Sequence, residues 1–161
     1  MGVPRGSRDP SGVAGMVRVM ATGVFDLLHP GHVYFLEEAK KLGDELVVVV
    51  ARDATAKRLK HEPIVPEHLR VQVVSALKPV DKALLGSATD IYQTVVDVKP
   101  DIIALGYDQI WDEQEVEVEA ARRGVKVKVV RLPEIPHDHL ATKRLVERIL
   151  ERARSTEDPS R

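Results

Sequence analysis

The chain of 161 residues has no cysteine, few aromatic residues and no marked excess of either charge. Without cysteine it has neither a disulfide framework nor a thiol nucleophile. A formal net charge of -1 excludes the broad basic field that nucleic-acid binding usually requires. Its apolar runs, such as residues 46–51, are too short to cross a bilayer, and the N-terminus lacks the apolar core of a signal peptide. We therefore expect a cytoplasmic protein that acts on small molecules, with no nucleic acid or membrane as partner.

The length predicts one main domain with short ends that do not belong to its fold. Residues 1–15 are rich in Gly, Pro and Ser and lack periodicity, so we expect a disordered N-terminal extension. Part of it, residues 3–7, resembles either a vector-derived protease site or a natural extension. The domain is expected over residues 16–154, and a polar tail over residues 155–161.

Apolar runs alternate with segments of helical period along this domain. They predict strands over residues 17–21, 46–51, 82–85, 102–105 and 125–130, and helices over residues 31–41, 67–77, 90–98, 113–123 and 141–152. This alternation predicts an α/β fold: a single Rossmann-like, doubly wound domain with a five-stranded parallel sheet and flanking helices. Ligands of such sheets bind at the carboxyl ends of the strands, so the loops after the first, second and fourth strands should converge.

The segment TGVFDLLHPGH, residues 22–32, joins the first strand to the first helix. Gly23 allows a tight turn, Pro30 suits a first helical turn, and the free N–H groups of that turn favour an anion. His29 and His32 share one face of this turn and can donate hydrogen bonds to phosphate oxygens. The alternatives are histidines with a purely structural role and half of a zinc site, but zinc needs further ligands that the sequence does not place nearby. We therefore expect no protein-bound metal.

With these residues the chain resembles the HxGH nucleotidylyltransferases, over residue 17 to about residue 149. The resemblance is closest to the small archaeal FAD synthases and the glycerol-3-phosphate-type cytidylyltransferases, and it is carried further by residues 43–53, 66–70, 76–81 and 99–109. It implies that His29 and His32 bind a nucleoside triphosphate and stabilise the transition state at its α-phosphorus. It also implies nucleotide binding by the surrounding Val24, Phe25, Pro30 and Gly31, and Mg²⁺ or another divalent cation on the phosphates. Relatives often form homodimers, so the resemblance allows a homodimer.

Two basic segments supply further candidates. Residues 52–60 read as a loop in which Lys57 or Lys60 could act in catalysis as a flexible charge on phosphate; the alternative is an ordinary solvated loop. Arg70 matches an arginine that the relatives keep on their corresponding helix, which implies phosphate binding. The alternative is a surface arginine that pairs with Glu67.

The loop after the fourth strand should lie at the active rim, where Gly106 and Asp108 are nucleotide-binding candidates. The alternative for Asp108 is that it caps the next helix, a role that Asp112 could equally fill. Thr142 matches a threonine of the relatives that precedes a phosphate-binding helix, although the flanking hydroxyl residues are replaced. His137 and His139 could compensate or could be ordinary loop histidines.

The resemblance implies an FAD synthase, which transfers AMP from ATP to FMN by in-line attack of the FMN phosphate on the α-phosphorus. Two alternatives stay open: a CTP-dependent cytidylyltransferase that makes a CDP-alcohol, and a nucleotide-binding module without catalysis. A flavin would need an apolar or aromatic slot, for which the aromatic residues near the predicted rim are Phe25, Tyr107 and Trp111.

Overall fold

The computed structural model describes residues 15–134 and 142–156. Within them, five parallel strands form one sheet in the order β3-β2-β1-β4-β5. The strands are β1 (Arg18–Gly23), β2 (Glu45–Val50), β3 (Lys82–Leu85), β4 (Ile102–Leu105) and β5 (Lys128–Arg131). The predicted fold class is therefore confirmed.

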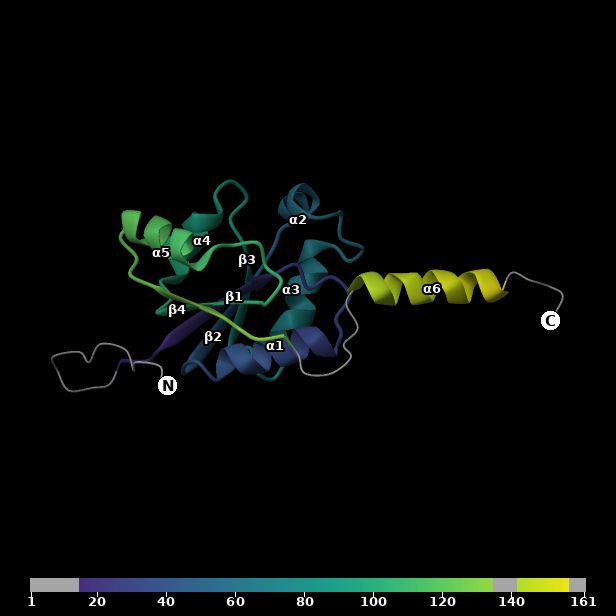
Figure 1. Cartoon of the computed structure of the whole chain (residues 1–161), viewed down its shortest axis with the longest axis horizontal. Coiled ribbons are helices and arrows are strands. Elements are labelled where there is room, and N and C mark those ends of the chain that lie inside the picture. Colours follow the sequence, from purple (N-terminus) through teal and green to yellow (C-terminus); the bar gives the residue numbers. More distant parts are fainter. Residues whose placement is uncertain (1–14, 135–141, 157–161) are drawn as a thin grey trace.

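Helices connect the strands and cover both faces of the sheet (Figure 1). Those that the structure describes are α1 (Pro30–Lys40), α2 (Asp53–Leu59), α3 (Glu67–Ser75), α4 (Ile91–Val98), α5 (Glu113–Arg122) and α6 (Thr142–Thr156). Helix α6 extends away from the sheet and has no buried residue. No helix in the described ranges has both the length and the apolar character needed to cross a membrane.

Three predicted elements differ from the structure. Residues 53–59 form helix α2 where a loop was expected; its alanines favour a helix, and Asp53 in its first turn and Lys57 in its last complement the helix dipole. Strand β5 begins at Lys128 and not at residue 125, because Gly124 takes a φ of 81° and the Val125 N–H closes a turn on Ala120. Helix α6 reaches Thr156, within the expected polar tail, and its predicted first residue lies outside the described residues.

Alternating strand residues divide the core between the two faces. Val19, Ala21 and Val48 belong to one apolar cluster, which includes Leu36 of α1 and Val74 of α3. A second cluster holds the opposite set of strand residues with α4 and α5, and it comprises Met20, Val47, Val49, Val95, Val98, Ile103, Leu105, Val116, Ala120, Val125 and Val129. Buried strands of a parallel sheet need this double covering, which explains the nearly continuous apolar sequences of β2 and β4.

The order of the strands creates a switch point between β1 and β4. The chain adds β2 and β3 on one side of β1, then returns so that β4 pairs with the other side, with Ala21 opposite Ala104. The connections on the two sides of this point leave the sheet in opposite directions, so a crevice opens at the carboxyl ends of β1 and β4. The loops after Gly23 and Leu105 border it.

Candidate active site

Described residues line two adjoining cavities at this end of the sheet. The polar cavity, of about 310 Å³, is lined by residues that include His29, His32, Gly106, Tyr107, Asp108, Thr142 and Lys143. The apolar cavity, of about 210 Å³, lies over the sheet face covered by α4 and α5, and its lining includes Met20, Val49, Leu105, Ile91, Tyr92, Val95, Ile110 and Trp111. The residues that line both are Thr22, Gly23, Val24, Lys60 and Gln109. The cavities thus meet at the end of β1.

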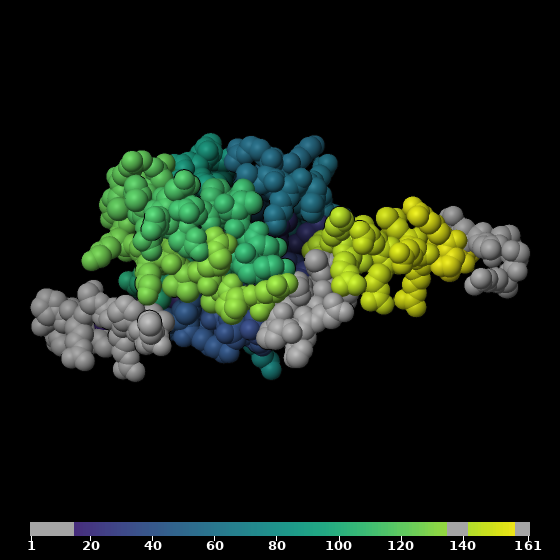
Figure 2. All heavy atoms as spheres, in the orientation of Figure 1, coloured from purple at the N-terminus to yellow at the C-terminus, as the bar shows by residue number. Residues whose placement is uncertain are grey.

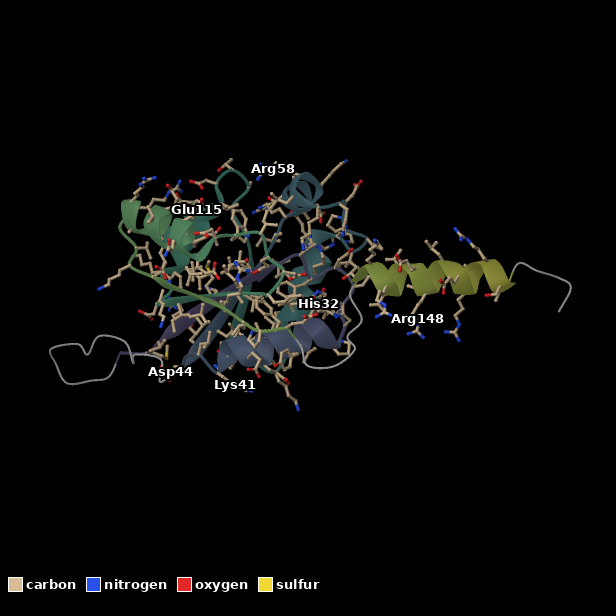
Figure 3. All side chains as sticks on the ribbon, in the orientation of Figure 1. His32, Lys41, Asp44, Arg58, Glu115 and Arg148 are labelled. Atoms are coloured by element: carbon tan, nitrogen blue, oxygen red, sulfur yellow. The ribbon has the colours of Figure 1, made fainter. Side chains whose placement is uncertain are left out.

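His29 and His32 lie at the start of α1 as a stacked pair, with ring centroids 3.9 Å apart. His29 caps the helix, since its Nδ1 accepts a hydrogen bond from the Gly31 N–H at 3.1 Å. A neutral imidazole that accepts through Nδ1 carries its proton on Nε2, so His29 can donate from Nε2. His32, in the first turn of α1, is labelled in Figure 3.

The expectation of free N–H groups in the first turn of α1 is wrong. Pro30 has no N–H, Gly31 donates to the His29 ring, and the N–H groups of His32 and Val33 donate to the His29 carbonyl at 3.0 and 3.4 Å. The helix dipole still favours an anion here. The hydrogen-bond donors for a phosphate would then come from the imidazoles and not from the helix backbone.

His32 is held in its neutral form. Burial, His29 and the Lys60 ammonium lower the pKa of His32 to about 4, against the opposing effect of Asp26. Its ring packs edge-on against Phe25 at 5.4 Å, and its Nδ1 is buried without a hydrogen-bond partner among the described residues. Buried polar atoms are rarely left unsatisfied, so this ring fits a position that hydrogen-bonds to a bound ligand.

The loop between β1 and α1 has an unusual backbone. Phe25 adopts a φ of 52°, a left-handed conformation that is costly for an aromatic residue. Its ring lies over Gly23, where an added Cβ would come within 2.8 Å of the ring. Gly23 is therefore needed for this close approach, whereas the residue that turns the chain is Phe25.

Arg70 and Asp26 hold this loop in place from inside the protein. Arg70 is 1% exposed, and its guanidinium donates to the carbonyl oxygens of Val24 and Val65 and to Asp53 Oδ1, at 2.6, 2.8 and 2.6 Å. Asp26 is buried, and its carboxylate accepts the N–H groups of residues 64 and 65. The surface pairing of Arg70 with Glu67 is therefore wrong. Phosphate binding by Arg70 stays a prediction. Its guanidinium already donates hydrogen bonds to three groups of the protein.

The two lysine candidates differ in position. Lys60, which ends α2, lines both cavities and acts electrostatically on His32. Lys57 is 68% exposed at its side chain, pairs with Glu62 at 3.6 Å and lines neither cavity. Of the two, Lys60 is placed to meet a phosphate.

The loop after β4 is fixed by two side chains that sequence reasoning did not select. Gln109 accepts from the Gly106 N–H at 2.8 Å and donates to the Thr22 carbonyl at 2.9 Å, so it joins this loop to β1. Arg131 donates to the carbonyls of Gly106, Gln109 and Trp111 at 3.0, 2.9 and 2.5 Å. Arg131 is the last residue of β5, which pairs with β4. This position at the carboxyl end of a strand was the signal that could have marked it as a residue of the active rim.

The remaining candidates fall on the polar cavity or outside the described residues. Asp112 caps α5 by accepting from the Glu115 N–H, so Asp108 does not serve as that cap. Asp108 and Thr142 line the polar cavity with the histidine pair. In Figure 2 purple atoms from the early part of the described chain lie recessed between α2 in blue and α6 in yellow. His137 and His139 lie outside the described residues.

Comparison with known proteins identifies the family of this chain. A cytidylyltransferase-like family model matches residues 20–157. The chain belongs to the cytidylyltransferase-like family. Relatives include an FAD synthase of Aciduliprofundum boonei, 62% identical over 85% of this chain and 93% of the relative, and an FAD synthase of Archaeoglobus profundus, 52% identical over 87% and 90%. The two alignments therefore span nearly the whole length of both relatives.

Solved structures share the fold of this chain. A lipopolysaccharide core biosynthesis protein of Thermoplasma volcanium is 55% identical, with a TM-score of 0.73 over 75% of this chain and 99% of that protein. TmcAL of Thermotoga maritima, bound with alpha-thio ATP, is 14% identical with a TM-score of 0.60 over 86% of this chain and 51% of that protein, a likeness of fold alone.

Proposed function

We propose that this chain is an FAD synthase, which transfers AMP from ATP to FMN and releases pyrophosphate. The observation that carries the proposal is the identity to FAD synthases, 47–62% among the archaeal relatives that match over at least 84% of this chain. The stacked histidine pair at the helix N-terminus supports it, because direct transfer requires donors aimed at the α-phosphate and no protein nucleophile.

In the reaction, an oxygen of the FMN phosphate forms a bond to the α-phosphorus of ATP. The bond from this phosphorus to the bridging oxygen breaks on the opposite side, and pyrophosphate leaves with that electron pair. His29 Nε2–H and the neutral imidazole of His32 hydrogen-bond to the α-phosphate oxygens as their charge grows. Lys60, at the junction of the cavities, is placed to neutralise phosphate charge.

A divalent cation such as Mg²⁺ fits this site as a partner of the phosphates. The residues that the structure describes include no group of three or more His, Asp or Glu side chains able to hold a metal ion. Such an ion would be held mainly by the triphosphate, as is usual for Mg²⁺, and would neutralise the negative charge that builds up on the leaving pyrophosphate.

The decisive experiment crosses ATP or CTP with FMN or glycerol 3-phosphate and measures pyrophosphate release and product by chromatography. FAD from ATP and FMN is the expected product, and activity with CTP alone would overturn the proposal. His32→Ala should lower turnover about 10²–10³-fold with an unchanged circular dichroism spectrum. Turnover near the wild-type value would remove His32 from the catalytic residues.

Cytoplasmic location and a homodimer stay predictions of the proposal. Cell fractionation and light scattering of the purified protein measure them directly.

A further inference from the structure

In an in-line transfer the attacking oxygen of the acceptor and the leaving pyrophosphate of the nucleotide lie on opposite sides of the α-phosphorus. The two cavities meet at a strip that Thr22, Gly23, Val24, Lys60 and Gln109 line in common. A reacting phosphorus at this strip would have one substrate extending into each cavity. The chemistry of the linings can therefore assign the substrates.

The polar cavity suits the nucleoside triphosphate. It contains the histidine pair, the N-terminal end of α1, the carboxylate of Asp108 and the ammonium of Lys143. These groups complement phosphate charge and the hydrogen-bonding edge of a base.

The apolar cavity offers few free polar groups for a nucleobase edge. Its base is formed by apolar side chains of the sheet, and Tyr92, Trp111 and Ile110 border it. The Thr94 hydroxyl already accepts the Ser87 N–H, and the Ser87 hydroxyl accepts the N–H groups of residues 89 and 90. A flat ring system with an apolar dimethylbenzene end matches the apolar part of this lining, where adenine would leave its ring nitrogens without partners.

We infer that the apolar cavity binds the isoalloxazine ring of FMN, with Tyr92 of α4 and Trp111 of the loop before α5 as its aromatic contacts. The inference rests on the proposed function and adds the site of the acceptor. The dimethylbenzene part of the ring packs over Val49, Leu105 and Val95, while the phosphate at the other end of the ribityl chain reaches the strip at Lys60. The residues that select the ring of the acceptor then lie in α4 and the loop before α5, outside the histidine motif.

The loop that carries Trp111 is built to hold such a contact. Arg131 bonds to the Trp111 carbonyl at 2.5 Å and to Glu113 at 2.7 Å, on either side of the helix cap at Asp112. Tyr92 is steadied by the Arg123 guanidinium, 4.8 Å above the centre of its ring. Both aromatic side chains also pack against the second apolar cluster, so they are placed before any ligand enters, which lowers the entropic cost of binding.

The test compares Tyr92→Leu and Trp111→Leu with Tyr107→Leu, a matched aromatic change in the polar cavity. FMN binding is followed through flavin emission, which falls when a tryptophan or tyrosine touches the ring, with and without a non-hydrolysable ATP analogue. We expect Tyr92→Leu and Trp111→Leu to raise both Kd and KM for FMN about three- to tenfold and to restore part of the flavin emission. KM for ATP should change less than twofold in these two variants. Tyr107→Leu should leave the Kd for FMN unchanged.

The inference is overturned if folded Tyr92→Leu and Trp111→Leu leave the Kd for FMN unchanged, whatever Tyr107→Leu does, or if those two variants raise KM for ATP alone. A circular dichroism spectrum accompanies each variant, and Trp111→Phe, which keeps a ring, should restore most FMN affinity if Trp111→Leu misfolds. Failure of the proposed function gives a different result: the wild-type protein would form no FAD from ATP and FMN. If the wild-type protein also leaves the flavin emission of FMN unchanged, the inference falls together with the proposed function; if it binds FMN without forming FAD, the same variants still test the site.

Discussion

Replacement of Arg70 by methionine should destabilise the protein strongly. Methionine keeps much of the apolar volume of the side chain and removes the guanidinium. The residue is buried on α3, and its three donors tie Val24, Val65 and Asp53 together. The change therefore isolates the polar contribution of Arg70 to the loop that carries the site.

The magnitude follows from the groups left behind. Hydrogen bonds to a charged group contribute about 1.5–3 kcal/mol each, and a buried acceptor without a partner costs about 1–3 kcal/mol. The carbonyls of Val24 and Val65 lose their guanidinium partner, whereas Asp53, whose side chain is 44% exposed, regains water. We expect a loss of about 3–5 kcal/mol in the free energy of unfolding, or a Tm about 10 °C lower for a domain of this size.

Urea denaturation followed by circular dichroism measures this loss, with Arg122→Met as the control. Arg122 forms an exposed ion pair with Glu119, so its loss should cost less than about 1 kcal/mol. Arg70→Lys should be nearly as damaging as Arg70→Met, because an ammonium cannot reach three divergent acceptors. If Arg70→Met costs less than about 1 kcal/mol and instead raises KM for ATP, Arg70 contacts phosphate and the loop does not depend on it.

Three further predictions concern the same site. Because the fold lowers the pKa of His32 from 6.5 to about 4, its neutral form stabilises the protein fully above pH 6.5; this contribution, about 3 kcal/mol at most, is lost as the pH falls toward 4. As the pH is lowered across this range, the urea midpoint should therefore fall more steeply for the wild type than for His32→Asn. Parallel plots of midpoint against pH would show that protonation of His32 does not cause the loss of stability. Lys60→Met should lower kcat/KM about ten- to a hundredfold while Lys57→Met stays within twofold; equal effects would place both lysines on phosphate. Arg131→Met should raise KM for both substrates and lower the Tm, because the loop after β4 loses its bonds to that side chain; unchanged kinetics would show that Gln109 alone holds the loop.

The α/β fold could be predicted because its signal is local. The strands are rich in apolar residues, most clearly β2 and β4, and several helices carry a cap or a clear period, as with Asp90 before α4 and Asp112 before α5. Helix α2 escaped prediction because its charged residues suggested a solvated loop more strongly than its alanines suggested a helix. The histidine pair was predictable for the same reason as the strands, since a spacing of three residues places both side chains on one face of a turn.

The sequence by itself determined the class of fold, the histidine pair and the resemblance that points to nucleotidyl transfer. Only the tertiary structure decided which side chains serve that site, because the partners of Arg70, Gln109 and Arg131 include residues far away in the chain. It also separated Lys60 from Lys57 and brought Tyr92 and Trp111 to one cavity. A sequence pattern records the spacing of neighbours along a chain, whereas hydrogen bonds and cavities depend on distances that exist only after the strands have paired.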